Sequence, residues 1–452
     1  MLVKISIENF KSFDNAVELT MISSNKIRTN ASHRVKIKST QILKYGVVYG
    51  ANASGKTNLV EFFRFFKECV QIGIPMEAMQ MFCKNRQENK EKESHFELQI
   101  TVGDKFYAYG FSAILSRRKI TEEWLYELYQ NGTARRLFER EGSKRPVLDE
   151  SVTLSNAEKN RFEIYADDFS GNESSLFLTE MNRGKKYGTR SKLMFFRDVY
   201  DWIKNHIVII TPNTPLIDLE YYYDEDSLLL INKLIETFDT GINQVKIEEI
   251  SLDELANAMP KPVFEKVMQH IKSRIGNQEN PSFRMTMRSN ESFFNIEAKD
   301  HDEPKVTTIK LHHNRSFYDF SFEEESDGTR RLFELMDMLL NQRDDILYVV
   351  DELERSLHPK LTEHFLQLFM QLHKEQRMQL LFTTHESSIM DQAIFRRDEI
   401  WFIERDNDNA SVIYSLDRFK ERYDKVLSKA YLEGRYGAIP VFTSFEFAGE
   451  GE

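Results

Sequence analysis

Polar and apolar residues alternate along much of the N-terminal third of the chain, a pattern typical of half-buried β-strands. Residues 2–7 form the first such run. A longer pattern over 94–116 is interrupted by the pair Gly103-Asp104, which favours a hairpin turn. Similar runs cover 16–21, 120–126 and 134–140. The N-terminal third is therefore predicted to contain an antiparallel β-meander.

Helical spacing of apolar residues becomes common after Asp149, where the composition turns more polar. Amphipathic helices are predicted over 155–178, 192–204, 226–237 and 251–275. Strands are predicted over 206–210, 283–296 and 305–311. The pattern suggests one domain in two halves, at 1–150 and 301–452, separated by a mainly helical insertion at 151–300.

The bulk composition predicts a folded cytoplasmic protein with two lobes or domains. A chain of 452 residues is too long for one compact core, and 41% hydrophobic residues are ample for packed interiors. Its two cysteines, Cys69 and Cys83, exclude a disulfide framework and the common zinc motifs. The N-terminus lacks the apolar core of a signal peptide, and no apolar run approaches the roughly 18 residues of a membrane span. We therefore expect no membrane contact.

The charge balance gives no support for a nucleic-acid partner, because the net charge is −11 and the pI is about 5.6. An acidic chain can still carry a local basic surface. The densest basic stretch contains Arg183, Lys185, Lys186, Arg190 and Lys192. A solvated loop and a contact with a phosphate backbone both remain open for this stretch, and the solvated loop is favoured.

The sequence from Gly50 to Thr57 has the glycine spacing of a loop that holds nucleotide phosphates. It follows an apolar run, 45–49, which predicts a buried strand, and it precedes a predicted helix over 58–72. Glycines allow backbone N–H groups to turn towards a phosphate, and a helix N-terminus adds further donors. Lys56 would reach the terminal phosphates and the Thr57 hydroxyl would bind Mg²⁺. An incidental glycine-rich turn is the alternative, which the complete motif in this context disfavours.

A second apolar run, 346–350, ends in the acids Asp351 and Glu352. A buried parallel strand would place both acids at its C-terminal edge, where ligands bind in open α/β sheets. Asp351 could hold the Mg²⁺ shell through water, and Glu352 could act as a general base on the attacking water. A long insertion separates Thr57 from Asp351, so the nucleotide-binding sheet is predicted to be divided between the two ends of the chain.

Three further stretches belong to the C-terminal half. Residues 325–331 precede an apolar helix over 332–340, and Ser326 with Gly328 would open an anion site there, although an ordinary helix cap explains the serine equally well. Pro359 is placed to start another helix. A strand over 380–384 ends in His385, which could orient a γ-phosphate, whereas a lone histidine at a strand end would be structural.

Taken in order, these stretches resemble the ABC-type ATPase heads of the RecF, SMC, Rad50 and OLD group. The matching segments read IENFKSF (7–13), GANASGKTNL (50–59), ESDGTRR (325–331), VVDELERSLHP (349–359) and FTTH (382–385). The resemblance implies an α/β fold of the P-loop NTPase class, with a split mixed sheet, an N-terminal β-subdomain and an inserted helical region. It also implies ATP hydrolysis with Mg²⁺ and a homodimer or larger homo-oligomer formed through the heads.

The resemblance also implies a role for individual residues. ATP would contact Lys11 and the loop residues Asn52, Ala53, Ser54, Gly55, Lys56, Thr57 and Asn58. Thr57 and Asp351 would hold the metal, and Glu352, His385 and Lys56 would be catalytic. Ser326 and Gly328 of another copy would contact the γ-phosphate, while Ser356 and Leu357 would line the dimer seam. The signature motif reads Ser-Asp-Gly at 326–328, where many transporters have Ser-Gly-Gly. The Q-loop glutamine of the family has no clear counterpart in this sequence, and Gln99 is the candidate.

Within this group the chain most resembles the stand-alone RloA/AriA type of bacterial phage-defence ATPase. The segments HFELQI (95–100), EEWLYE (122–127), LFERE (137–141) and YLEGRYGAIP (431–440) carry this likeness. The clustered acids of a TOPRIM nuclease are not found after His385. The favoured hypothesis is therefore an ATPase that senses infection and controls a separate effector, such as a TOPRIM-type nuclease encoded nearby. A RecF-like ATPase that clamps DNA, and a protein that binds nucleotide only as a structural ligand, are the alternatives.

Overall fold

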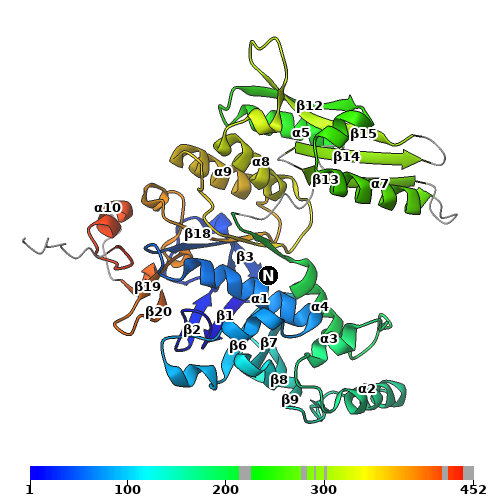
Figure 1. Ribbon diagram of the computed structural model, residues 1–452. Coiled ribbons are helices and arrows are strands. Elements are labelled where there is room, and N and C mark those ends of the chain that lie inside the picture. Colours follow the sequence, from blue (N-terminus) through cyan, green and yellow to red (C-terminus); the bar gives the residue numbers. More distant parts are fainter. Residues whose placement is uncertain (213–224, 276–281, 290–291, 300–302, 420–425, 441–452) are drawn as a thin grey trace, which may run out of the picture. The chain divides into compact units, whose positions relative to one another are not determined.

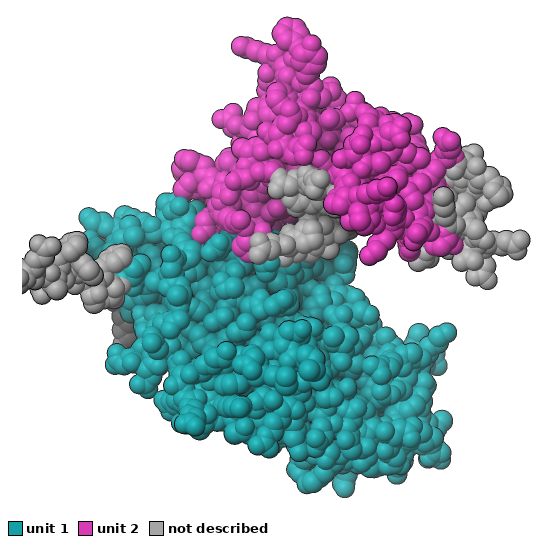
Figure 2. All heavy atoms as spheres, in the orientation of Figure 1, with its two compact units in different colours: residues 1–211, 343–353, 373–452 teal, residues 212–342, 354–372 magenta. Residues whose placement is uncertain are grey.

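The computed structural model describes the chain except for residues 213–224, 276–281, 290–291, 300–302, 420–425 and 441–452. The chain divides into two compact units, coloured separately in Figure 2. The first unit contains Met1–Thr211, Arg343–Leu353 and His373–Glu452. The second contains Pro212–Gln342 and Glu354–Leu372. The first unit is thus assembled from three separate stretches of the chain.

A seven-stranded antiparallel sheet in the first unit contains the predicted meander (Figure 1). Its order is β10-β9-β8-β7-β6-β1-β2. Buried and partly exposed side chains alternate along β6, as the sequence pattern requires. The strands are β1 (Leu2–Glu8), β2 (Val17–Thr20), β6 (Ser94–Val102), β7 (Lys105–Ile114), β8 (Lys119–Leu128), β9 (Ala134–Glu141) and β10 (Val147–Leu148).

A six-stranded sheet in the same unit joins the two ends of the chain. Its order is β11-β17-β18-β5-β19-β20, parallel except for β20. Strand β5 (Tyr45–Tyr49) is wholly buried and comes from the N-terminal part of the chain. The other strands are β11 (Ile207–Ile210), β17 (Leu347–Val350), β18 (Gln379–Thr384), β19 (Ile400–Arg405) and β20 (Ser411–Ser415). The sheet is therefore split as predicted, with β18 between β5 and β17.

Helix α1 (Lys56–Ile72) contacts both sheets of the first unit. The ring of Phe65 packs at a tilt against Phe96, and that of Phe66 packs edge-on against Tyr109, both in the seven-stranded sheet. The helix also contacts β11 and β17. This burial of aromatic rings explains why the helix forms at this place in the sequence. The unit also contains α2 (Asn156–Phe169), α3 (Phe177–Asn182), α4 (Met194–Asn205), α10 (Leu427–Leu432) and the hairpin of β3 (Arg34–Ile37) and β4 (Thr40–Leu43).

The second unit is built on a five-stranded antiparallel sheet, ordered β12-β15-β14-β13 with β16 paired to β15. Phe294, Ile296 and Val306 of this sheet are buried with residues of α6 and α7. The strands are β12 (Ile242–Ile250), β13 (Ser282–Ser289), β14 (Ser292–Lys299), β15 (Lys305–His313) and β16 (Phe320–Ser321). The helices are α5 (Glu225–Glu236), α6 (Leu252–Asn257), α7 (Lys261–Ile275), α8 (Asp327–Leu340) and α9 (Pro359–Leu372).

The structure differs from the predicted division at 150 and 300. The predicted mainly helical insertion contains β12, β13 and β14, and its strand β11 belongs to the nucleotide-binding sheet. Strand β12 was not predicted, because its apolar residues, at 242, 245, 247 and 250, do not alternate strictly with polar ones. The predicted helix over 251–275 is two helices, because Pro260 cannot continue α6 but suits the start of α7. Among the described helices, none is long and apolar enough to cross a membrane.

Candidate nucleotide site

The glycine loop joins the end of β5 to the start of α1, the arrangement that its sequence predicts. Gly55 has a φ of 112° and caps α1, a backbone conformation that suits glycine. A Cβ at Gly50 would lie 2.4 Å from the carbonyl oxygen of Ile403. Both glycines are thus required by the local geometry, and the loop leads directly to the positive end of a seventeen-residue helix.

Lys56 is buried and its ammonium group lies within the loop. Its Nζ donates hydrogen bonds to the carbonyl oxygens of Gly50, at 2.7 Å, and Ala51, at 3.0 Å. The same Nζ lies 3.4 Å from Nδ1 of His385. Lys56 in the glycine loop and His385, which follows β18, are therefore neighbours, although they are far apart in the sequence.

Asp351 and Glu352 follow β17 directly and share one hydroxyl group. Thr383 Oγ1 donates to Asp351 Oδ1 at 2.6 Å and accepts from the backbone N–H of Glu352 at 2.9 Å. Asp351 is buried, whereas Glu352 has a φ of 49° that turns the chain away from the strand. Sequence analysis placed Thr383 in a motif but gave it no role. A threonine two positions before the histidine that follows β18 is the signal that could have identified it.

Glu352 and His385 face each other at the edge of this sheet. Glu352 Oε1 lies 3.9 Å from His385 Nε2, and their side chains are 40% and 36% exposed, so water can reach both. Burial lowers the pKa of His385 below its ordinary 6.5, the charge of Lys56 lowers it further, and Glu352 and Asp351 oppose this shift. His385 is therefore neutral at pH 7, with one ring nitrogen available as a donor.

The first turn of α1 places the other predicted nucleotide ligands. Thr57 is exposed there, and Asn58 Nδ2 donates to Ser12 Oγ at 2.7 Å. Lys11 lies against the same helix, where its Nζ is 3.6 Å from Glu61 Oε2. A Cβ at Gly55 would lie 2.7 Å from Ser12 Oγ. Ser12 thus supports the loop from behind, and Lys11 lies near the start of α1.

Two residues that sequence analysis did not identify hold the backbone of the loop. Arg405 Nε donates to the carbonyl oxygen of Ala53 at 2.7 Å, and Ser411 Oγ donates to that of Ser54 at 2.5 Å. A trans peptide points its N–H opposite to its C=O, so the N–H of Gly55 is directed away from Ser411. The strands β19 and β20 therefore orient the loop. Neither residue belongs to a sequence motif, because each acts through the backbone of its target.

The predicted signature residues Ser326 and Gly328 lie in the second unit, at the start of α8. Ser326 Oγ accepts a hydrogen bond from the backbone N–H of Thr329 at 3.1 Å, so it caps the helix. A Cβ at Gly328 would lie 2.7 Å from the carbonyl oxygen of Ser356, which explains the glycine. Ser356 has a φ of 61° and precedes Leu357. The signature and the predicted dimer seam are thus adjacent in one unit.

The residues of the first unit fit ATP with Mg²⁺. The glycine loop has no room for a Cβ atom at Gly50 or Gly55, and it leads to the N-terminus of α1. Lys56 lies inside the loop. A threonine hydroxyl and an aspartate carboxylate, from Thr57 and Asp351, are the hard oxygen donors that Mg²⁺ prefers. The predicted Q-loop residue Gln99 lies instead on β6, where its side chain bonds Glu97.

Three acids after His385 have partners elsewhere in the fold. Arg396 bonds Asp398, and His33 bonds Glu399 at 3.1 Å. Glu404 Oε2 accepts from the backbone N–H of Ala438. Within the described residues there is no group of three or more histidine, cysteine or acidic side chains that could hold a metal ion. Asp398, Glu399 and Glu404 therefore have structural partners.

The split parallel sheet, the glycine loop and the acid pair define a P-loop NTPase of the ATPase-head type. A family model described as "AAA domain, putative AbiEii toxin, Type IV TA system" matches residues 47–391, and the chain belongs to this family. The match begins in β5 and ends after His385, so it includes every predicted site residue except Lys11. A comparison with curated proteins finds no match.

Solved structures of SMC heads are also similar to the chain. An SMC head bound to the C-terminal winged-helix domain of ScpA has 13% identity and a TM-score of 0.39, covering 92% of this chain and 97% of that one. The SMC head domain from Thermotoga maritima has 14% identity and a TM-score of 0.36, covering 92% and 98%. An SMC head from Pyrococcus furiosus bound to ScpA has 12% and 0.37, covering 96% and 99%. The fold assignment rests on the family match and the strand order, because these scores are low.

Proposed function

We propose that the protein hydrolyses ATP at a site completed by a second copy of the chain, and that this cycle controls a separate effector in bacterial defence against phage. The arrangement of Lys56, His385 and Glu352 around one edge of the split sheet carries this proposal. Lys56 is placed to bind the terminal phosphates, and Glu352 is exposed to water. Family membership supports nucleotide hydrolysis by these residues.

In the proposed reaction, water attacks the γ-phosphorus and the bond from that phosphorus to the β–γ bridging oxygen breaks. Glu352 accepts a proton from the attacking water, and ADP and phosphate are released. Lys56 and the N-terminus of α1 stabilise negative charge on the phosphates, while neutral His385 donates a hydrogen bond to the γ-phosphate. Thr57 and Asp351 would hold Mg²⁺, and a bound Mg²⁺ would supply positive charge beside the phosphates.

The second copy would contribute Ser326 and Gly328. Ser326 caps the backbone N–H of Thr329, and the other N–H groups at the start of α8 would be available to bind an anion. The resemblance to ATPase heads that pair through this motif supports the assignment. A cycle of this kind makes assembly depend on ATP, which is the property a sensor requires.

The separate effector is proposed from two observations. Asp398, Glu399 and Glu404 after His385 have protein partners, and the segments at 95–100, 122–127 and 431–440 resemble phage-defence ATPases of the RloA/AriA type. The matching family is itself named for a toxin of a toxin–antitoxin system. A nuclease, such as a TOPRIM-type enzyme encoded nearby, is the effector class that these systems suggest.

The proposal is tested by measuring ATP hydrolysis and the molecular mass of the purified protein with and without ATP. Hydrolysis that Lys56→Ala abolishes, together with an ATP-dependent rise in mass, is the expected result. Co-expression with neighbouring genes should yield a complex that co-purifies. Absence of turnover and of ATP-dependent assembly would contradict the enzymatic proposal, and failure of every neighbour to co-purify would contradict the effector.

A further inference from the structure

A basic loop of the first unit lies outside the nucleotide site. Between Glu180 and Asp198 the chain has no acidic residue but six basic ones, although the whole chain has a net charge of −11. The basic residues are Arg183, Lys185, Lys186, Arg190, Lys192 and Arg197. The loop connects α3 to α4, and neither helix belongs to the nucleotide site. Its charge therefore needs an explanation of its own.

The backbone of this loop is held by specific hydrogen bonds. Arg161 Nη1 donates to the carbonyl oxygen of Lys186 at 3.0 Å, and Arg197 Nη2 donates to that of Lys185 at 2.6 Å. Tyr187 Oη donates to the carbonyl oxygen of Met181 at 2.6 Å. Two arginines and a tyrosine thus fix the course of a segment without regular secondary structure. A loop that only carried solvated charges would not need these bonds.

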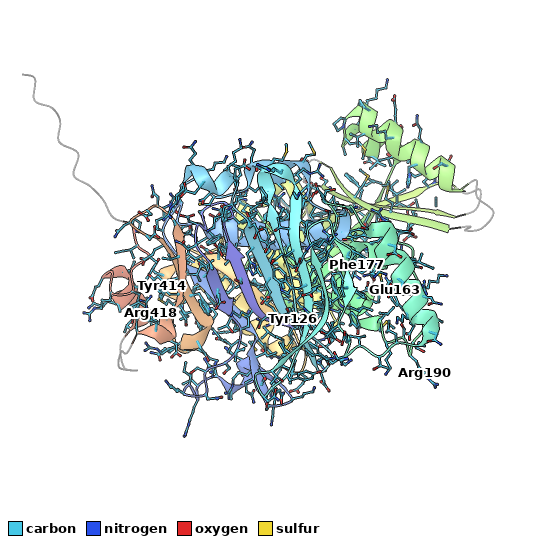
Figure 3. All side chains as sticks on the ribbon, turned by 90° about the horizontal axis from the view of Figure 1, so that it is seen from below. Tyr126, Glu163, Phe177, Arg190, Tyr414 and Arg418 are labelled. Carbon is cyan, nitrogen blue, oxygen red and sulfur yellow. The ribbon has the colours of Figure 1, made fainter. Side chains whose placement is uncertain are left out.

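Four of the basic side chains have no acidic partner within 4 Å among the described residues. They are Arg183, Lys186, Arg190 and Lys192, and all four are exposed. Lys185, by contrast, is paired with Glu180, and Arg197 lies 3.6 Å from Asp201. Figure 3 shows Arg190 at the edge of the fold, pointing away from it. In a chain rich in acids, four neighbouring unpaired cations create a local positive field.

The loop also forms the wall of two cavities. One has a volume of about 710 Å³ and is lined by Arg161, Tyr165, Tyr187, Arg190 and Lys192 among others. The second, of about 630 Å³, is also lined by residues 189–192 and includes Lys105 and Arg135. Arg190 and Lys192 line both cavities. Each volume is within the range of ligand sites.

The acid in the wall of the first cavity is already bonded. Glu158 accepts hydrogen bonds from Ser155 Oγ and Ser191 Oγ, both at 2.8 Å, and from the backbone N–H of Lys192. The hydrogen bond from Ser155 is the main reason that its pKa is lowered to about 2. In the second cavity, Glu127 and Asp198 offset part of the positive charge. The acids that line the two cavities therefore leave Arg190 and Lys192 without an acidic partner among the described residues.

We propose that this loop and the cavities beside it bind the phosphate groups of a nucleic-acid strand. Exposed lysine and arginine side chains are the usual contacts to a phosphodiester backbone. Stacking of bases is disfavoured, because Lys185 Nζ lies 4.2 Å from the ring centre of Tyr165 and the Arg197 guanidinium lies 5.6 Å from that of Tyr187. Recognition is therefore of the backbone, without sequence preference. The positive charge of this loop outweighs the net negative charge of the whole chain. It therefore favours a contact with a phosphate backbone over a solvated loop.

The test is fluorescence polarisation with a labelled duplex DNA and a labelled single-stranded RNA over a range of salt concentrations. The variant Arg183→Gln, Lys186→Gln, Arg190→Gln, Lys192→Gln removes the unpaired cations. The matched control Arg64→Gln, Lys144→Gln, Lys360→Gln, Arg435→Gln makes the same change in net charge, but each of its residues is paired with an acid. Melting temperature and ATP binding check that both variants are folded.

The wild type and the matched control should bind at least one of the two nucleic acids, and the loop variant should bind at least about tenfold more weakly. For duplex DNA the log–log dependence on salt should become shallower by roughly 2 to 4, since each neutralised phosphate contact contributes about 0.9. Equal binding by the two variants would overturn the proposal. Competition by AMP at the same phosphate concentration as the oligonucleotide would also overturn it, in favour of a small phosphorylated ligand.

Discussion

The two units of the protein use their motif residues in different ways. In the first unit, His385 lies 3.4 Å from Lys56 and 3.9 Å from Glu352, so three distant parts of the chain meet at one place. In the second unit, Ser326 caps its own helix through Thr329, and Gly328 lies where a Cβ would meet the carbonyl oxygen of Ser356. The first unit is thus organised to bind and activate a ligand. The second presents a capped helix start, which in the proposed mechanism acts on ATP bound by another copy.

Aromatic side chains show the same contrast. The phenylalanines of α1 are buried between two sheets of the first unit. In the second unit, Phe317 and Tyr318 are 96% and 84% exposed, a few residues before Ser326. Asp319 holds this segment through bonds to Lys246 and His312. Exposed aromatic rings on a fixed segment are typical of a contact surface, which agrees with a role for this unit in assembly.

Glu352→Gln should have the largest effect, because it removes the proposed general base while keeping the shape of the side chain. We expect kcat to fall by about 10²- to 10⁴-fold with little change in ATP affinity. The variant should also remain assembled when ATP is present. Single-turnover hydrolysis and mass photometry measure both effects, and unchanged turnover would remove Glu352 from the mechanism.

Replacing the exposed aromatics tests the second unit by itself. The double variant Phe317→Ser, Tyr318→Ser should weaken ATP-dependent assembly about tenfold or more, because burial of one such ring contributes about 1.5–3 kcal/mol. The control Tyr129→Ser changes a 43% exposed tyrosine of the first unit. ATP binding should be the same in all three proteins. Assembly of the double variant at wild-type affinity would show that these rings face solvent throughout the cycle.

Arg405→Met and Ser411→Ala test the support of the glycine loop. Each removes one donor to a loop carbonyl, so we expect the KM for ATP to rise about three- to tenfold, from about 1 kcal/mol per hydrogen bond, while kcat changes little. Arg405→Lys keeps the charge and a donor and should restore part of the affinity. Arg435→Met is the matched control. A fall in kcat with KM unchanged would argue against a positioning role.

The smallest expected effect is on the pKa of His385. Lys56→Met should raise this pKa, because the lysine charge lowers it, and Asp351→Asn should lower it. NMR titration of labelled histidines, assigned with His385→Gln, measures the shifts. Because the folded pKa is below 6.5, protonation favours the unfolded chain, so the stability from this group is present above pH 6.5 and is lost as the pH falls through the folded pKa. Shifts of the opposite sign would contradict the geometry.

Local sequence patterns were enough to predict the antiparallel meander and the split parallel sheet. Alternation predicted the meander, and the two apolar runs ending at Tyr49 and Val350 predicted that distant strands share one sheet. The sheet of the second unit was not predicted as such, because β12 pairs with β15 across many residues and lacks strict alternation. Pairing between remote strands leaves little local signal.

The site could be predicted where a residue type performs the chemistry itself, as Lys56, Asp351, Glu352 and His385 would. Residues that act through the backbone of others, such as Arg405 and Ser411, could not be found in this way. Thr383 is intermediate, because it lies inside a motif but its bonds to Asp351 and Glu352 depend on the register of β17 and β18. The role proposed for the basic loop could not be predicted from the sequence, because it rests on the hydrogen bonds of the loop and on the cavities beside it.

Mixing two inactive variants tests most directly whether a neighbouring copy completes the site. Lys56→Ala disables the first unit, and Ser326→Arg blocks the second, with Ser326→Thr as a control that keeps the helix cap. Half of the dimers in an equal mixture are mixed, and each has one intact site, so hydrolysis should recover to about a quarter of the wild-type rate. A mixture that exchanges subunits but remains as inactive as its components would contradict the account.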